Sequence, residues 1–348
     1  MNSLMAENET LPRNCTFEEA DWRILAKHWY PIALSREVAN NPVAAKLLDA
    51  LLIIYRLGDE IIVADDLCPH RGVPLSMGTS DAGGIRCAYH GLQFGAKGKC
   101  THIPASPDRS IPEKLHLKTY PVIELYGLVW TCLCPGENDS TSISPMPHWD
   151  DTDYQQMTCP WIDIYGFAGR QIEGFLDVAH FAFVHTDTFG EADNAVVPPY
   201  NPVYNANGFD VEYRSTVSNY PLGFKDKAPK DYEWLRHFTM HLPFTALLQV
   251  HYPNHGKLVI MNAASPVSAK VTRLFVPIAK NFDKDMPVQD IYDFNKKVFE
   301  EDKAIVEAQK PECLPLDPKM EAHITADRSS IAYRKGLRDM GLSRFFIS

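Results

Sequence analysis

The chain has 348 residues, of which 45% are hydrophobic and 22% are charged, and its formal net charge is −10. This length allows two domains with separate cores, and the composition is ordinary for a globular protein. The negative charge, without any run of Lys or Arg, argues against nucleic acid or a membrane as a partner. Residues 1–14 carry no apolar signal segment, and the longest apolar run, residues 47–55, is too short to span a bilayer, so we expect a cytoplasmic protein.

The first half of the chain is predicted to be a small all-β domain that follows a short helix. Residues 16–19 have the pattern of a capping box, which predicts a helix that ends at Ala26. Two strand-like runs occupy residues 51–65 on either side of a turn at Gly58. Further short strands separated by glycine turns follow, and the apolar segment 126–130 predicts the strand that closes the domain.

Two short motifs in this half offer two cysteines and two histidines. Cys68-x-His70 and Cys87-x-x-His90 each provide one thiolate and one imidazole from a loop. Two chemistries fit this set: a structural zinc site, or a Rieske [2Fe–2S] cluster whose outer iron is held by two His. The flanking residues favour iron, because a zinc finger more often combines Cys-x-x-Cys with His-x3–5-His in a much smaller unit.

The composition changes after the β domain. Residues 136–147 are rich in Gly, Glu, Asn, Asp, Ser, Thr and Pro, which predicts a linker. Alternating segments beyond it predict an antiparallel sheet with a hairpin turn at residues 254–256. These segments are 209–217, 244–252, 258–264 and 271–279. A helix is expected over residues 287–309 from the spacing of its apolar residues. The apolar stripe consists of Ile291, Phe294, Val298 and Ile305.

A second group of polar side chains lies in the apolar segment 173–185. Asp177 precedes His180 by three positions, and His185 follows five positions later. On an ideal helix the two histidines would be about 140° apart, so the segment must bend, end or bulge for both to meet one ion. Burying these groups among Phe side chains would be costly without ligation or hydrogen bonds. We therefore interpret the histidines as metal ligands rather than as core residues.

Two histidines and one carboxylate form the facial triad of non-haem Fe(II) oxygenases, which leaves positions open for O₂. The late helix offers the carboxylate. Asp302 lies on its apolar stripe, between Val298 and Ile305, where a carboxylate needs a partner. We predict Asp302 as the third ligand, with Glu301 as the alternative.

Together these motifs resemble the oxygenase component of a Rieske non-haem iron oxygenase, from about Trp29 to the 327–342 tail. The size and motifs are most similar to the branch of vanillate, dicamba and caffeine demethylases, which is related to phthalate-type oxygenases. The expected fold class is α+β, with an N-terminal all-β Rieske domain and a C-terminal helix-grip domain built on an antiparallel sheet and helices. The expected domains are a helical segment at 1–27, the Rieske domain at 28–135, a linker at 136–147 and a catalytic domain at 148–348.

The resemblance also implies roles for matching residues. Asp177 would not be a ligand: it would connect His90 of the neighbouring subunit to His180 and carry the electron across the interface of a ring-shaped homotrimer. Glu173 stands where relatives often have Asn or Asp near the iron. The implied metal ligands are Cys68 and Cys87 for the inner cluster iron, His70 and His90 for the outer one, and His180, His185 and Asp302 for a mononuclear Fe(II).

The function implied by the resemblance is that of a terminal oxygenase. It would use O₂ to monooxygenate an aromatic or cyclic small molecule, by hydroxylation or by O- or N-demethylation, and ring cis-dihydroxylation of an aromatic carboxylate is the alternative. Electrons would come from a separate NAD(P)H-dependent reductase or a ferredoxin, because the chain has no Gly-x-Gly-x-x-Gly motif. Two other classes stay open: a non-catalytic Rieske electron carrier and a zinc-stabilised binding module. We expect the residues that select the substrate mainly between positions 197 and 261.

Overall fold

The computed structural model describes residues 10–39, 41–136, 143–221, 224 and 227–342. The chain forms two compact units, residues 1–142 and 143–348, which we call the N-terminal and C-terminal units. The division lies within the predicted linker, of which residues 137–142 are outside the described part. Among the described residues, no helix has the length and apolar character needed to cross a membrane.

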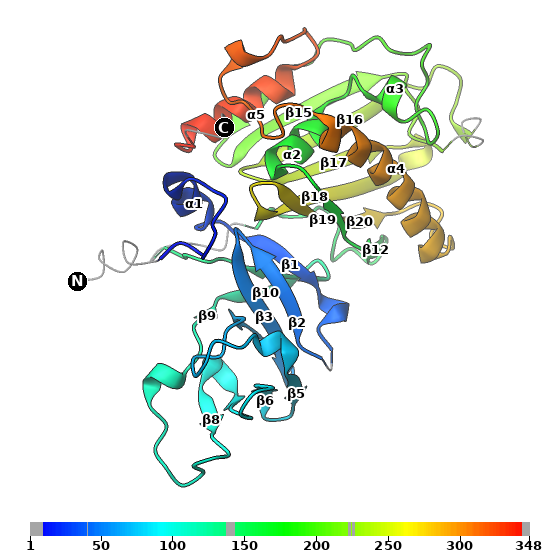
Figure 1. The fold of residues 1–348 in the computed structure, drawn as a ribbon. Helices are drawn as coiled ribbons and strands as arrows, with labels where there is room; N and C mark the ends of the chain where they lie inside the picture. Colours follow the sequence, from blue (N-terminus) through cyan, green and yellow to red (C-terminus); the bar gives the residue numbers. More distant parts are fainter. Residues whose placement is uncertain (1–9, 40, 137–142, 222–223, 225–226, 343–348) are drawn as a thin grey trace. The chain divides into compact units, whose positions relative to one another are not determined.

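The N-terminal unit contains small antiparallel sheets and the α-helix α1 (Glu19–Leu25) (Figure 1). The strand orders of its three sheets are β1-β11-β10, β2-β3-β4-β9 and β5-β6-β7-β8. The strands are β1 (Tyr30–Leu34), β2 (Val43–Leu47), β3 (Ala50–Leu57), β4 (Glu60–Asp65), β5 (Thr79–Asp81), β6 (Gly84–Arg86), β7 (Gln93–Phe94), β8 (Cys100–His102), β9 (Thr119–Tyr120), β10 (Val122–Leu125) and β11 (Leu128–Thr131). The two strands predicted in residues 51–65 are β3 and β4, joined by a turn in which Gly58 has a φ of 61°.

The predicted short helix and closing strand are both present, but one detail of each prediction is wrong. Helix α1 begins at Glu19 without a side-chain cap, because the Thr16 hydroxyl donates a 2.6 Å hydrogen bond to the buried Asp49 carboxylate instead. The closing strand β11 begins only at Leu128, since the preceding Tyr126 and Gly127 have φ values of 58° and 69° and form the turn from β10. In both places a tertiary contact or a turn overrides the local pattern.

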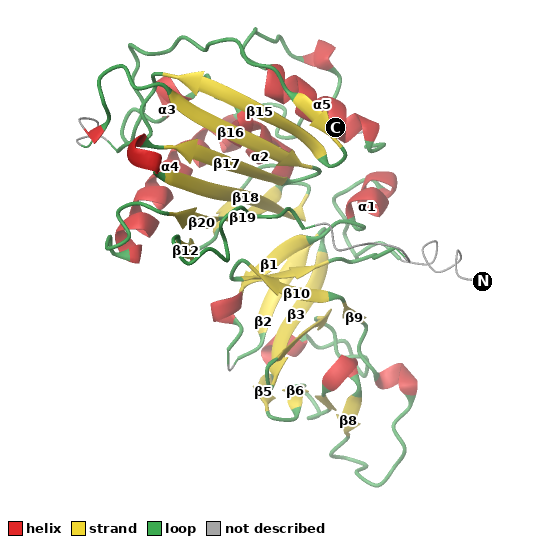
Figure 2. Ribbon diagram, turned by 180° about the vertical axis from the view of Figure 1, so that it is seen from behind, coloured by secondary structure: helices red, strands yellow, loops and turns green. Residues whose placement is uncertain are grey.

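The C-terminal unit contains a nine-stranded antiparallel sheet with helices on one face (Figures 1 and 2). Its main strand order is β12-β20-β18-β17-β16-β15-β14, and β19 pairs with both β13 and β18. The strands are β12 (Gln155–Thr158), β13 (Ile162–Ile164), β14 (Val203–Asn205), β15 (Gly208–Ser215), β16 (Trp234–His241), β17 (Thr245–His251), β18 (Lys257–Ser268), β19 (Val271–Phe275) and β20 (Pro277–Lys280), and the helices are α2 (Ala168–Leu176), α3 (Phe181–Val184), α4 (Val288–Ala308) and α5 (Arg328–Asp339). The predicted α+β class and the predicted hairpin turn at residues 254–256, between β17 and β18, are confirmed.

Strand β16 is absent from the sequence prediction because its inner face carries a charge. Trp234, Arg236 and Phe238 alternate as buried residues, while Leu235 between them is half-buried. An arginine on the inner face and a leucine on the outer face hide the period of two that normally identifies a strand.

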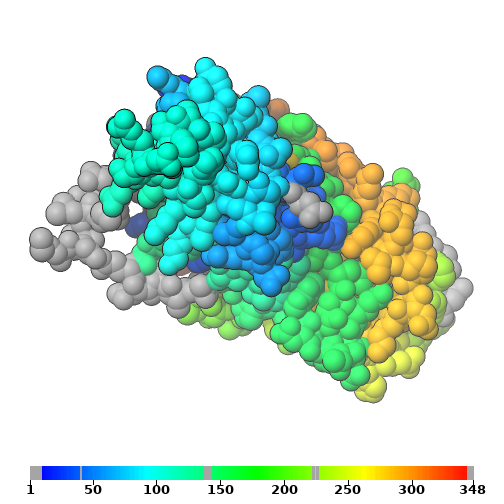
Figure 3. All heavy atoms as spheres, turned by 90° about the horizontal axis from the view of Figure 1, so that it is seen from below, coloured from blue at the N-terminus to red at the C-terminus, as the bar shows by residue number. Residues whose placement is uncertain are grey.

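Helix α4 confirms the predicted late helix but buries a slightly different face. Its buried residues are Ile291, Asn295, Phe299 and Val306, and Ile305, predicted on the apolar stripe, is 49% exposed. The outer side of α4 forms part of the molecular surface, in orange in Figure 3. Asp302 is four residues before Val306 and seven after Asn295, so it lies on the buried side, as predicted.

Candidate metal centres

The two cysteine–histidine loops of the N-terminal unit have the same backbone geometry. In the first, the N–H of Cys68 donates to the carbonyl of Val73 and the N–H of Gly72 to that of Cys68. In the second, the N–H of Cys87 donates to the carbonyl of Leu92 and the N–H of Gly91 to that of Cys87. Gly72 and Gly91 have φ values of 70° and 69°, a left-handed conformation that favours glycine. The Cys-x-x-x-Gly spacing in both motifs therefore has a structural cause.

The four candidate ligands divide into a buried pair and an exposed pair. Cys68 and Cys87 are each 2% exposed and belong to the hydrophobic core of the unit. The rings of His70 and His90 are exposed, with centroids 4.6 Å apart. An asymmetric cluster with an inner thiolate-bound iron and an outer imidazole-bound iron fits this arrangement.

The surroundings of Cys68 suit a thiolate that holds metal. Burial raises the pKa of its thiol to about 11, and the main-chain N–H groups of His70 and Arg71 act in the opposite direction by donating hydrogen bonds to the sulfur. N–H···S bonds of this kind stabilise negative charge on a cluster and tune its potential.

Two hydroxyl side chains near the loops have other contacts. Ser76 donates a 2.6 Å hydrogen bond from its Oγ to Asp66, and its main-chain N–H donates to the same carboxylate. Tyr89 packs its ring 3.8 Å from the His90 ring. Ser76 thus fixes the loop that follows Cys68, and Tyr89 shields one side of the exposed imidazole.

In the C-terminal unit, the helix in the segment with the two histidines is interrupted, as predicted for two histidines that bind one ion. Helix α2 ends at Leu176, Asp177 has extended angles (φ −76°, ψ 136°), and the short helix α3 runs between His180 and His185. This break lets both imidazoles face one point.

That point is completed by Asp302 from α4. The Nε2 atoms of His180 and His185 lie 3.1 Å apart, and Asp302 Oδ1 lies 3.5 Å from the first and 3.2 Å from the second. Ligands about 2.1 Å from one ion on a face of an octahedron would be about 3 Å apart. The predicted triad is therefore together in space, with a geometry that fits one metal ion.

Each histidine of the triad has a carboxylate behind it. Asp177 Oδ2 lies 3.1 Å from Nδ1 of His180, and Glu301 Oε2 lies 2.8 Å from Nδ1 of His185. An Nδ1–H donor to a carboxylate fixes the tautomer that leaves Nε2 free to bind metal. Glu301, the alternative third ligand, thus lies behind His185, where it also accepts a hydrogen bond from the Thr188 hydroxyl.

The electrostatics of the triad favour a cation. Burial lowers the pKa of His180, but the Asp177 and Asp302 carboxylates outweigh this and raise it to about 9. Burial raises the pKa of Asp302, and His180 and His185 more than reverse the shift, so that the net pKa is lowered. A site that stabilises positive charge on its imidazoles also stabilises a bound metal ion.

Glu173 does not reach toward the triad. Its carboxylate accepts hydrogen bonds from Arg334 at 2.6 and 2.9 Å and from Arg170 at 3.3 Å. Both arginines also bind Glu321, at 2.7 Å from Arg170 and 2.6 Å from Arg334. The expectation of a position near the iron is replaced by a cluster of four charges, three buried and Glu321 half-buried, that joins α2 to α5.

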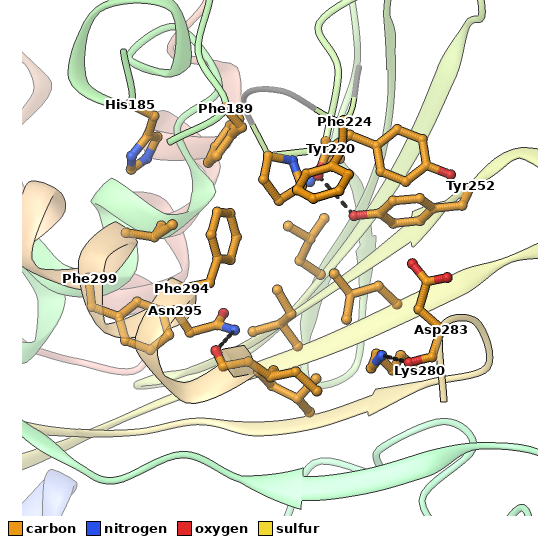
Figure 4. A pocket seen from close by; sticks show the side chains of 18 of the residues that line it. His185, Phe189, Tyr220, Phe224, Tyr252, Lys280, Asp283, Phe294, Asn295 and Phe299 are labelled. Atoms are coloured by element: carbon orange, nitrogen blue, oxygen red, sulfur yellow. Dashed lines mark hydrogen bonds between the residues drawn. The ribbon is translucent and has the colours of Figure 1, made fainter. Parts of the chain in front are cut away.

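The triad faces a cavity of about 400 Å³ with mostly apolar walls. Figure 4 shows aromatic side chains along it, among them Phe189, Tyr220, Phe294 and Phe299. The expectation that its residues lie mainly between 197 and 261 is too narrow, because α4 and the segment 278–286 also line it. Sequence reasoning missed this because the wall forms only when α4 packs over the sheet.

Known proteins match both halves of this arrangement. The Rieske [2Fe-2S] domain family matches residues 28–121, and the vanillate O-demethylase oxygenase C-terminal domain family matches residues 168–342. The methylxanthine N1-demethylase NdmA of Pseudomonas putida is 32% identical over 92% of this chain and 90% of its own length. The methylxanthine N3-demethylase NdmB of the same organism is 29% identical over 93% and 91%. The structure of Pseudomonas putida NdmA with caffeine has a TM-score of 0.79 at 30% identity, covering 91% of this chain and 92% of that one.

Proposed function

Because the chain belongs to the Rieske non-haem iron oxygenases, we propose that it removes a methyl group from nitrogen or oxygen of an aromatic or heterocyclic small molecule. The observation that carries the proposal is the similarity to N-demethylases along nearly the whole chain. The family match of the C-terminal unit adds support for O-demethylation as the related reaction. The aromatic-lined cavity beside the triad has the size and character for such a substrate.

The chain is an oxygenase component that uses a Rieske [2Fe–2S] cluster and a mononuclear iron and depends on a separate reductase. We assign the cluster to Cys68, His70, Cys87 and His90, on the basis of the buried thiols and the converging imidazoles. We assign the mononuclear iron to His180, His185 and Asp302. The cytoplasmic location stays a prediction.

The proposed reaction is a monooxygenation followed by loss of formaldehyde. One atom of O₂ enters a C–H bond of the methyl group, and the other leaves as water with two electrons and two protons. The resulting carbinol releases formaldehyde and leaves an N–H or O–H on the product. Bound iron supplies O₂ activation, for which a facial triad leaves positions open. The apolar walls of the cavity hold the ring and exclude water.

We also propose that the active form is a homotrimer in which Asp177 links two subunits. Its Oδ2 binds Nδ1 of His180, while the side chain stays 28% exposed and lines a second, polar cavity. A carboxylate can accept more than one hydrogen bond, so Asp177 can also accept one from His90 of a neighbouring subunit. The imidazole–carboxylate–imidazole contact would connect the two metal centres.

The test is product analysis with an NADH-driven reductase of the same type of system. Caffeine, theophylline, vanillate and dicamba are supplied as candidate substrates, and formaldehyde and the demethylated product are measured. Formaldehyde in equal amount to product, dependent on O₂, is expected. A cis-diol without formaldehyde would replace demethylation by ring dihydroxylation. Reduction of the cluster with no oxygenated product from this panel would contradict the proposed substrate class.

A further inference from the structure

One side of the active-site cavity is formed by the sheet, whose side chains there are apolar except for Lys280. Leu248, Ile260 and Ile278 face one another across β17, β18 and β20 and form one apolar row. In the next row Leu258 faces Lys280, on the same side of the sheet. Side chains paired across antiparallel strands point to the same face, so the Lys280 side chain lies along the cavity.

Lys280 differs from the other charged residues of this cavity outside the triad. Lys227, Asp283 and Asp290 are exposed, whereas Lys280 is 4% exposed. Lysine is almost never buried without a compensating partner. Burial lowers the pKa of Lys280, which reflects this cost.

The contacts of Lys280 leave its charge without an anion. Its Nζ donates to the main-chain carbonyls of Phe282 at 3.0 Å and Asp283 at 2.6 Å. The neighbouring Asp283 carboxylate forms an ion pair with Lys227 at 3.2 Å, so it is not an ion-pair partner of Lys280. An ammonium group has three N–H donors, and two are used by the carbonyls. In the described part of the chain, Lys280 has no carboxylate within ion-pair distance.

The position of Lys280 defines which part of a substrate it can meet. Figure 4 shows Lys280 and Asp283 at one end of the cavity and His185 of the triad at the other, with Phe294 and Tyr220 between them. A planar molecule whose methyl group lies at the triad would present its opposite edge to Lys280.

We propose that Lys280 binds an acceptor oxygen, of a carboxylate or a ring carbonyl, on the substrate edge opposite the methyl group that is removed. The orientation toward the triad rests on the proposed function, but the binding of an acceptor oxygen by Lys280 does not. Lys280 would be a specificity-determining residue that selects ring compounds with this group and fixes which methyl group faces the triad.

The test is equilibrium binding to iron-loaded protein without O₂ or reductase, measured by titration calorimetry. Two pairs of compounds are used: vanillate with guaiacol, which lacks the carboxylate, and caffeine with 7-methylpurine, which lacks the ring carbonyls and the two methyl groups of the six-membered ring. The change of the affinity ratio when Lys280 is substituted isolates the contribution of the acceptor oxygen. The wild type should bind the acceptor-bearing member of at least one pair at least about tenfold more tightly, the size expected for a charged hydrogen bond. The pair that shows the preference identifies the carboxylate or the carbonyl as the group.

Three variants separate binding from a structural role. Lys280→Met should bring the affinity ratio within the preferred pair close to one, and Lys280→Arg should retain most of the preference. Lys284→Met, which alters an exposed lysine of the same segment that does not line the cavity, is the matched control and should leave the ratio unchanged. A lysine that only stabilises its turn would alter both members of a pair equally and leave the ratio as it is.

Two results would overturn the inference: a wild type without preference in either pair, or a Lys280→Met protein that keeps the wild-type ratio. Cluster absorption and iron content establish that each variant is folded. A Lys280-dependent preference in a protein that releases no formaldehyde would contradict the proposed reaction and leave the inference standing.

Discussion

Single residues decide how the mononuclear site is assembled, and most of them could be identified from the sequence. Asp302 is recognisable because a carboxylate on the apolar side of a helix needs a partner. The role of Glu301 could not be recognised, because it depends on a contact with His185, a residue distant in the sequence. Only the fold shows that two adjacent carboxylates on α4 have different positions: Asp302 faces the Nε2 atoms of both histidines, and Glu301 lies behind His185.

A prediction at this scale concerns the support of His185. Glu301→Gln removes the negative charge behind the imidazole, so affinity of the mononuclear site for Fe(II) should fall by about 10- to 100-fold while cluster absorption is unchanged. The measurement is Fe(II) titration of protein whose mononuclear site has been emptied with a chelator. Thr188→Val, which removes the hydroxyl that donates to the same Glu301 oxygen and to the main-chain carbonyl of His185 but keeps the carboxylate, is the control and should have a smaller effect. Wild-type affinity in Glu301→Gln would contradict the supporting role, and complete loss of binding would make Glu301 a ligand.

At the scale of elements, the break between α2 and α3 could be predicted from chemistry although not from helix propensity. The segment 173–185 reads as one apolar helix, and only the need to bring His180 and His185 to one ion requires it to end. The charge cluster that joins α2, the helix before the break, to α5 was not predictable. It includes the buried charges of Arg170, Glu173 and Arg334, which come from α2 and α5.

This charge cluster makes a prediction about stability. Arg334→Met leaves Glu173 and Glu321 with one buried arginine between them, so unfolding free energy should fall by about 3 to 5 kcal/mol. Urea unfolding followed by tryptophan fluorescence measures the loss. Lys335→Met on the same helix removes an exposed pair with Asp339 and should leave stability unchanged. Equal stability of the two variants would show that the cluster does not hold α2 against α5.

At the scale of the whole molecule, the sequence predicts both metal centres because most of their candidate ligands come from short motifs, and because Asp302, the distant one, stands out on the apolar side of a helix. The walls of the cavity were less predictable, since they combine the sheet, α3 and α4. The trimer follows from the resemblance and from the exposed side of Asp177, and it stays a proposal.

The proposed link between subunits predicts the loss of a specific electron-transfer step. Asp177→Asn should retain both metals but abolish NADH-driven turnover, because the bridging carboxylate is lost. In a single-turnover experiment the reduced cluster of this variant should stay reduced when O₂ and substrate are added, whereas that of the wild type is reoxidised. Asp210→Asn, which alters a carboxylate paired with the half-buried His237, is the matched control and should turn over normally. Loss of the mononuclear iron in Asp177→Asn would instead make Asp177 a ligand.

The most direct measurement of the central claim is the iron and acid-labile sulfide content of protein purified without oxygen, in the wild type and in His180→Ala. The wild type should contain about three irons and two sulfides per chain, one [2Fe–2S] cluster plus one mononuclear iron. His180→Ala should lose one iron and keep both sulfides and the visible absorption of the cluster. Two irons and two sulfides in the wild type, not increased by added Fe(II), would indicate an electron carrier, and zinc without sulfide would contradict both metal assignments.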